Sequence, residues 1–243
     1  MRTSNPALND KIFKGVRAEV VDPSNVMTLD GTVNKTAFSI LLTIAAGYWS
    51  YSHPEMLKFS LPFAIAGFAL VMITMFKKEI APYTTPIYAV VEGLFLGSFS
   101  MIMDTQYPGI AFQAISLTFG TLLALLIAYK SGFIRATENF KLGVVAATGG
   151  IFVVYIISFV LSFFSVDVPF LTGNSLLAVG VSFFIVVVAA LNLVLDFDFI
   201  EKASDSGQAP KYMEWVGAMG LLVTLVWLYV EILRLLAKLQ SRD

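Results

Sequence analysis

The sequence predicts an all-α membrane protein, and two observations carry that prediction. Of the 243 residues, 57% are hydrophobic and only 14% are charged, whereas a soluble domain averages about 45–50% apolar and about 25% charged residues. The mean hydropathy is +0.79. The apolar residues also gather in blocks long enough for a helix to cross a bilayer, which takes about 17 to 25 residues.

Seven such blocks are predicted to be transmembrane helices. They run over Ala37–Tyr51, Phe59–Phe76, Pro86–Met103, Ile110–Tyr129, Leu142–Phe164, Asn174–Leu195 and Val216–Leu236. The first block is short. The connections are brief and carry proline and glycine turn signals, so no loop is long enough to fold separately. We therefore expect a polar cytoplasmic segment over residues 1–35, followed by a single seven-helix transmembrane domain over residues 36–243.

Lysine and arginine predict the orientation. With the N-terminus inside, twelve basic residues fall in inner segments and only Lys58 falls in an outer loop, which is a strong positive-inside signal. The inner set is Arg2, Lys11, Lys14, Arg17, Lys35, Lys77, Lys78, Lys130, Arg135, Lys141, Lys202 and Lys211. Seven spans place the C-terminus outside, yet Arg234, Lys238 and Arg242 lie there. Either the last helix is sheltered by the others, or it does not fully cross.

The composition also argues against several classes of function. A net charge of −1 argues against a nucleic-acid partner, and the absence of cysteine excludes disulfides, thiol catalysis and cysteine-ligated metal. The one histidine, His53, lies in a predicted outer loop, which argues against a zinc site. No nucleophile–base pair and no glycine-rich phosphate loop stands out. We therefore expect a non-enzymatic protein without a cofactor, whose certain partner is the lipid bilayer.

Four acidic residues lie in or against the apolar blocks. They are Glu92, Asp196, Asp198 and Glu231. An acidic group at the centre of a membrane helix costs roughly 2.5 to 3.5 kcal/mol on insertion scales, and such a residue usually faces a bundle interior or a water-filled path. These carboxylates are therefore the candidate functional residues.

Asp196 and Asp198 are predicted to face different ways. Two residues apart on a helix, they point about 200° apart. Asn192 lies one turn before Asp196 and makes a polar stripe with it, whereas Lys202 lies four residues after Asp198 and forms a favourable surface pair. We assign Asp196 to the interior and Asp198 to the inner surface. The alternative for Asp196 is an ordinary helix-end carboxylate in the headgroup region.

The other two acids also leave alternatives open. Glu231 interrupts an apolar run in the last helix, and its structural alternative is an ion pair with Arg234, three residues later. Glu92 precedes Gly93 and Gly97, whose spacing of four is a close-packing signature of membrane helices. Glu92 either lines the same cavity as the other acids or hydrogen-bonds a neighbouring helix.

Three strings carry a resemblance to a known family. They are Glu-Gly-Leu-Phe-Leu-Gly at 92–97, Asn-Leu-Val-Leu-Asp-Phe-Asp-Phe-Ile-Glu at 192–201, and Trp-Leu-Tyr-Val-Glu-Ile-Leu-Arg-Leu-Leu at 227–236. Together and in this order they resemble the Bax-inhibitor (TMBIM) family, most closely its bacterial branch. The resemblance covers nearly the whole chain.

The resemblance implies six helices around a central seventh, in a multi-pass protein of the plasma (inner) membrane with its N-terminus in the cytoplasm. It also implies a calcium leak gated by pH through two aspartates on the sixth and seventh helices. Asp196 matches the first, and Glu231 stands where the second would be, which is a departure. Calcium would be the permeant ion, held transiently by Asp196 and Glu231. Asn192, Asp198, Arg234 and Glu92 are candidate supporting residues along the pathway.

Two carboxylates in one site disfavour each other's ionisation, so Asp196 and Glu231 are expected to share a proton at low pH and to repel at higher pH. They meet only if the sixth helix runs on to about Ile200 and the seventh starts near Tyr212. Two rival functions remain. One is a proton-coupled transporter that uses the same carboxylates, and the other is a non-conducting partner of other membrane proteins.

Overall fold

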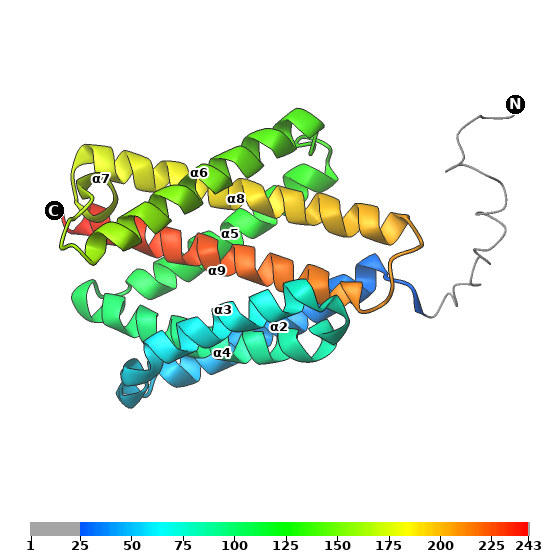
Figure 1. Ribbon diagram of the computed structural model, residues 1–243, viewed down its shortest axis with the longest axis horizontal. Helices are drawn as coiled ribbons and strands as arrows, with labels where there is room; N and C mark the ends of the chain where they lie inside the picture. Colours follow the sequence, from blue (N-terminus) through cyan, green and yellow to red (C-terminus); the bar gives the residue numbers. More distant parts are fainter. Residues whose placement is uncertain (1–24, 243) are drawn as a thin grey trace, which may run out of the picture.

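A computed structural model describes residues 25–242, and this part of the chain is helical, without β-strands. Figure 1 shows the arrangement. The long helices are α2 (Leu29–Tyr51), α3 (Ser60–Phe76), α4 (Ala81–Gln106), α5 (Ile110–Lys130), α6 (Glu138–Ser162), α8 (Leu176–Asp205) and α9 (Met213–Gln240). Short pieces are η3 (Pro54–Phe59), η4 (Lys78–Ile80) and α7 (Pro169–Thr172). The expected basic residues Arg2, Lys11, Lys14 and Arg17 lie outside the described residues.

Six helices in the described part are long and apolar enough to cross a membrane: α3 with η3, α4 with η4, α5, α6, α8 and α9. The expected all-α membrane class is therefore confirmed. The seventh expected span corresponds to α2, which is not among the six. Its first turns carry Asp30, Asn34 and Lys35, and these polar residues lower its mean hydropathy.

α2 is apolar on the outside and polar on the inside. Its buried side chains are Thr32, Thr36, Ser39, Thr43 and Ser50, whereas large apolar side chains such as Leu41, Tyr48 and Trp49 are exposed. This distribution is the reverse of a soluble helix, in which the apolar face points to the core. It suits a helix whose outer face meets lipid and whose small polar side chains pack against other helices.

The expected start of the first span at Ala37 was wrong by eight residues. Thr28 caps the helix, and its hydroxyl accepts a hydrogen bond from the Gly31 N–H at 3.0 Å, a standard way to satisfy the free N–H groups of a first turn. The sixth span was expected to end at Leu195, but α8 continues ten residues further to Asp205, and α9 begins at Met213, three residues before the expected Val216. The sixth helix thus passes Ile200 and the seventh starts near Tyr212, which is the extension that a meeting of Asp196 and Glu231 required.

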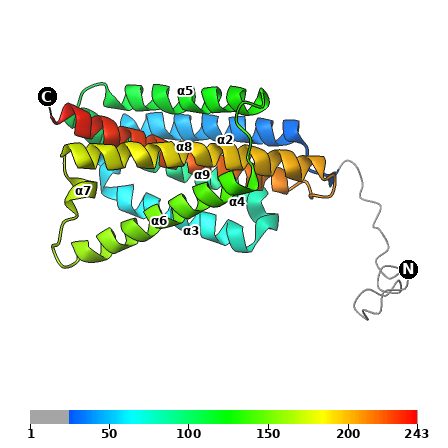
Figure 2. The same cartoon turned by 90° about the horizontal axis from the view of Figure 1, so that it is seen from above.

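α9 is the most deeply buried of the six apolar helices. It packs against α2, α4, α5 and α8, and in both views it runs through the middle of the bundle (Figures 1 and 2). Its buried residues Leu225, Leu228, Ile232 and Leu233 belong to the main hydrophobic cluster. The acidic residues Glu214 and Glu231 of α9 are therefore placed in the interior of the protein, whereas Arg234 is exposed.

α2 and α4 approach each other closely through glycines. A Cβ atom added at Gly97 would overlap the backbone carbonyl of Gly47, and one added at Gly93 would overlap the carbonyl of Thr43. The close packing expected of Gly93 and Gly97 is thus confirmed. Backbone atoms cannot move aside as a flexible side chain can, so this contact requires glycine.

We predict that Gly97→Ala destabilises the protein, because the new methyl group must push α2 and α4 apart. Overpacking of this kind costs about 1–3 kcal/mol. Gly120→Ala on α5 is the matched control, because a Cβ there meets open space. Thermal unfolding in detergent should show a lower melting temperature for Gly97→Ala alone. Equal melting temperatures for the two variants would contradict the close α2–α4 contact.

Candidate functional site: the buried acidic groups

Asp196 on α8 carries a buried oxygen without a partner. Its Oδ2 atom is shielded from solvent and makes no hydrogen bond to any described residue. The carboxyl group of Asp196 faces α9, where the Thr224 hydroxyl interacts with it. It also lies beside Gly220, since a Cβ atom added there would be 3.9 Å from Asp196 Oδ1. The expected interior placement of Asp196 agrees with this geometry. An incompletely paired carboxylate away from water is costly, which makes Asp196 the strongest candidate for a functional group.

Asp198 forms the ion pair expected of it and one more. Its Oδ2 atom lies 2.9 Å from the Lys202 ammonium, which confirms the predicted pair, and also 2.9 Å from the Lys141 ammonium on α6. The residue is only 9% exposed, so the expected surface pair is largely covered. The contact with Lys141 was not predicted, because spacing along one helix says nothing about a neighbouring helix.

Glu231 on α9 is 2% exposed and has two partners. The Tyr155 hydroxyl on α6 donates to Glu231 Oε1 at 2.8 Å. Arg234 lies 3.3 Å from the same oxygen and forms the ion pair that the sequence offered as an alternative. The sequence did not indicate Tyr155, which lies 76 residues away in the chain.

Asp196 and Glu231 do not share a hydrogen bond in the structure. Asp196 lies beside Gly220 and Thr224, and Glu231 is seven residues further along α9, about 10 Å at 1.5 Å per residue. α8 and α9 are antiparallel, since Lys238 near the end of α9 contacts Ser182 near the start of α8. The alignment of α8 with α9 therefore places Glu231 about two turns of α9 away from the residues that Asp196 faces, which does not favour the expected shared proton.

Glu92 is buried against α3. A Cβ at Gly67 would overlap the Glu92 carboxylate, so that glycine leaves room for it. Glu92 is 8% exposed and makes no hydrogen bond or ion pair with another described residue. The sequence offered two alternatives for Glu92, a hydrogen bond to a neighbouring helix or a place in the same cavity as the other acids. Glu92 makes no such hydrogen bond to a described residue, and it lies between α3 and α4, whereas Asp196 lies between α8 and α9.

α6 is joined to the rest of the bundle by a stripe of polar side chains seven residues apart: Lys141, Thr148 and Tyr155. Lys141 pairs with Asp198, Thr148 accepts a hydrogen bond from Asn192 Nδ2 at 2.8 Å, and Tyr155 donates to Glu231. Three of the five candidate residues predicted on α8 and α9, namely Asn192, Asp198 and Glu231, thus contact α6. Only Val144 and Ile151 of α6 are buried, so these polar contacts carry much of its attachment.

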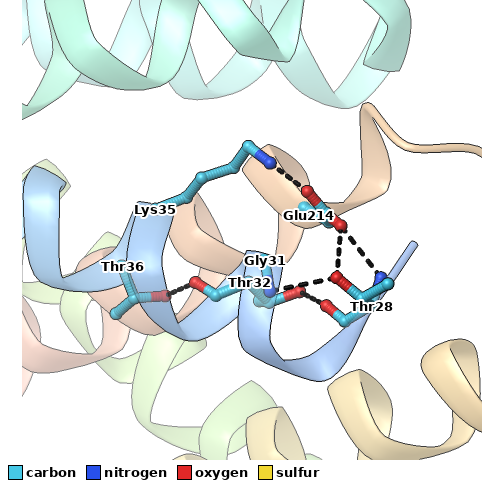
Figure 3. Close-up of polar contacts among 6 residues, drawn as sticks. All are labelled: Thr28, Gly31, Thr32, Lys35, Thr36 and Glu214. Atoms are coloured by element: carbon cyan, nitrogen blue, oxygen red, sulfur yellow. Dashed lines mark hydrogen bonds and ion pairs between the residues drawn. The ribbon is translucent and has the colours of Figure 1, made fainter. Parts of the chain in front are cut away.

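The most completely buried acid, Glu214, was missed by the sequence reasoning. It is fully buried at the start of α9 and pairs with the Lys35 ammonium from α2 (Figure 3). Its Oε1 also accepts hydrogen bonds from the Thr28 N–H and hydroxyl, both at 2.9 Å. A Cβ at Gly31 would overlap this carboxylate. The one feature of the sequence that could have indicated this contact is Gly31, which lies one turn before Lys35. It does not identify Glu214 on α9 as the partner.

Lys238, near the end of α9, is hydrogen-bonded to neighbouring elements. Its ammonium donates to the Leu171 carbonyl at 2.5 Å and to the Ser182 hydroxyl at 2.7 Å. Neutral oxygens of α7 and α8 therefore surround this charge, and α9 extends to Gln240. Lys238 is thus sheltered by the other helices, whereas Arg234 is exposed.

The described residues contain no cluster of three or more His, Cys, Asp or Glu side chains that could hold a metal ion. Calcium in proteins takes six to eight oxygen ligands. Asp196 and Glu231, expected to hold calcium together, lie apart. A calcium ion at Asp196 would therefore meet one carboxylate, the Thr224 hydroxyl and water, which suits brief passage better than tight binding.

We predict that Lys35 and Glu214 stabilise the protein as one unit. Lys35→Met leaves a buried carboxylate without its cation and should cost on the order of 3 kcal/mol. Glu214→Gln should also destabilise, and the double variant should be less unstable than the sum of the two single changes, because both act on one contact. Unfolding in detergent measures all three. Strict additivity would show that the two residues are not coupled.

Comparison with known proteins gives one match. The Bax inhibitor 1 like family matches residues 5–241. Searches of curated proteins and of solved structures gave no match. The family match covers almost the entire chain and includes all the acidic groups described above. The chain is therefore a multi-pass membrane protein that belongs to the Bax inhibitor 1 like family.

Proposed function

We propose that this protein is a pH-sensitive calcium leak of the plasma (inner) membrane, with seven spans, six of them around α9, and with its N-terminus in the cytoplasm. The observation that carries the proposal is the buried Oδ2 atom of Asp196, which has no partner among the described residues. Family membership supports the same function. α2 supplies the seventh span, because its exposed face is apolar and its length is 23 residues.

The chemistry of Asp196 links cations to pH. A carboxylate oxygen that lacks a donor inside a membrane protein is stabilised either by a proton or by a cation. The two compete for one group, so cation passage past Asp196 depends on pH. Glu231 has a different role in this proposal. It is occupied by Tyr155 and Arg234 and holds α6 against α9 rather than exchanging a proton with Asp196.

We predict that Asp196→Asn alters the calcium leak into liposomes and flattens its pH dependence, because the titrating group is gone. Asp198→Asn is the matched control on the same helix. It should lower stability, since Asp198 contacts two lysines, yet leave the pH dependence in place. The measurement is calcium entry into liposomes that hold the pure protein, across pH. A pH profile lost in Asp198→Asn and kept in Asp196→Asn would reverse the assignment.

Two further outcomes of the same assay separate the rival functions. Saturable, stoichiometric flux coupled to protons would indicate a transporter, which uses a carboxylate as its relay. The absence of any flux at every pH would indicate a non-conducting partner of other membrane proteins. Because Asp196 and Glu231 lie apart, the effects of Asp196→Asn and Glu231→Gln on the leak should add rather than overlap.

We predict that Lys78 faces the cytoplasm and Lys58 the outside. The chain contains no cysteine, so Lys78→Cys and Lys58→Cys each introduce a single reactive thiol. A membrane-impermeant maleimide applied from the outside should label Lys58→Cys alone, and permeabilisation should expose Lys78→Cys. Labelling of Lys78→Cys in sealed cells would overturn the orientation.

A further inference from the structure

An apolar groove opens on the side of the bundle between α2 and α5. It has a volume of about 410 Å³, and α4 and α9 contribute to its inner wall. Its mouth is formed by apolar side chains that are partly exposed: Ile44 and Tyr48 on α2, and Phe112 and Ile115 on α5. Leu222 and Leu225 of α9 form part of its floor. None of the carboxylates of the proposed leak lines this groove.

The polar groups deep in the groove are already paired. The Ser100 hydroxyl on α4 and the Tyr229 hydroxyl on α9 lie 2.7 Å apart, and the Thr118 hydroxyl donates to the Ala114 carbonyl of its own helix at 2.7 Å. A site holds water only where it offers the water several polar partners. The interior of this groove does not, so its natural occupant is apolar.

One end of the groove is different, because it carries an acidic group. Asp104 lies two residues before the end of α4. Its Oδ2 accepts a hydrogen bond from the Tyr51 hydroxyl at 2.8 Å, and its Oδ1 accepts from the N–H groups of Gly109 and Ala111 at 2.9 and 3.4 Å. No lysine or arginine of the described residues pairs with Asp104. The last residue of α2 and the end of α4 meet here, which is where a spanning helix reaches the headgroups.

We propose that the α2–α5 groove binds one acyl chain of a membrane phospholipid whose headgroup carries a primary amine, with that amine at Asp104. An apolar slot that opens sideways between membrane-spanning helices meets lipid tails before any other ligand. The Asp104 carboxylate at its end, which has no lysine or arginine partner among the described residues, selects a cationic headgroup that can donate a hydrogen bond. The inference requires only that the chain spans a bilayer and does not depend on the calcium leak.

The test uses purified protein in detergent, offered an equimolar mixture of phosphatidylethanolamine, phosphatidylcholine and phosphatidylglycerol with identical acyl chains. Native mass spectrometry then counts and identifies the lipids that remain bound. We expect one retained lipid per protein, with phosphatidylethanolamine preferred about threefold, as suits an exposed ion pair. Asp104→Asn removes the charge, keeps one oxygen that can still accept from the Gly109 N–H, and places an amide NH2 group opposite the Tyr51 hydroxyl, which can accept from it. This variant should abolish the preference while retaining the lipid.

Filling the groove should remove the lipid altogether. Ile115→Trp and Ile44→Trp enlarge partly exposed side chains on its opposite walls, where no tight packing is disturbed. Ile156→Trp on α6 is the matched control, because Ile156 is 46% exposed, close to the 43% of Ile115, and does not line the groove. Retention that survives both groove variants, or that falls equally in the control, overturns the site. Retention without a headgroup preference overturns the role of Asp104.

Discussion

Inside a bilayer, the protein itself must satisfy its polar groups, because no water is present to do so. The polar side chains of α9 are satisfied by a different neighbouring helix at each level. At its start Glu214 pairs with Lys35 of α2. Further along, Tyr229 contacts Ser100 of α4, Glu231 contacts Tyr155 of α6, and Lys238 contacts Ser182 of α8. These contacts fix the position of the central helix, and with it the polar surface that Asp196 faces.

The surrounding helices are attached in two distinct ways. α2 and α4 meet through glycines at Gly47, Gly93 and Gly97, where the backbones touch, and through hydrogen bonds from the Thr43 and Ser50 hydroxyls to backbone carbonyls of α4. α6 instead relies on hydrogen bonds and one ion pair, with few buried apolar side chains. The glycine contact involves no ionisable side chain, whereas the contacts of α6 include the carboxylates of Asp198 and Glu231.

The sequence predicted what depends on one helix at a time. Apolar length gave the membrane class, a spacing of four gave the Asp198–Lys202 pair, and Gly93 with Gly97 gave a close helix contact. It failed where two helices must be aligned. The separation of Asp196 from Glu231 is a matter of register between α8 and α9, and register follows from side-chain packing that no local pattern records. Glu214 was missed for the same reason, because its partner lies 179 residues earlier.

The position of α9 in the chain has a consequence for biosynthesis. The helix that occupies the middle of the bundle leaves the ribosome after all the other described helices, although a chain inserts and folds from its N-terminus. Until α9 arrives, Lys35 of α2 lacks the carboxylate with which it pairs, and Asp196 and Tyr155 lack the helix that they contact. The earlier helices are therefore present in the membrane before α9 occupies the middle of the bundle. A chain truncated before Met213 would retain that state permanently and present its polar inner faces to lipid or to the quality-control machinery.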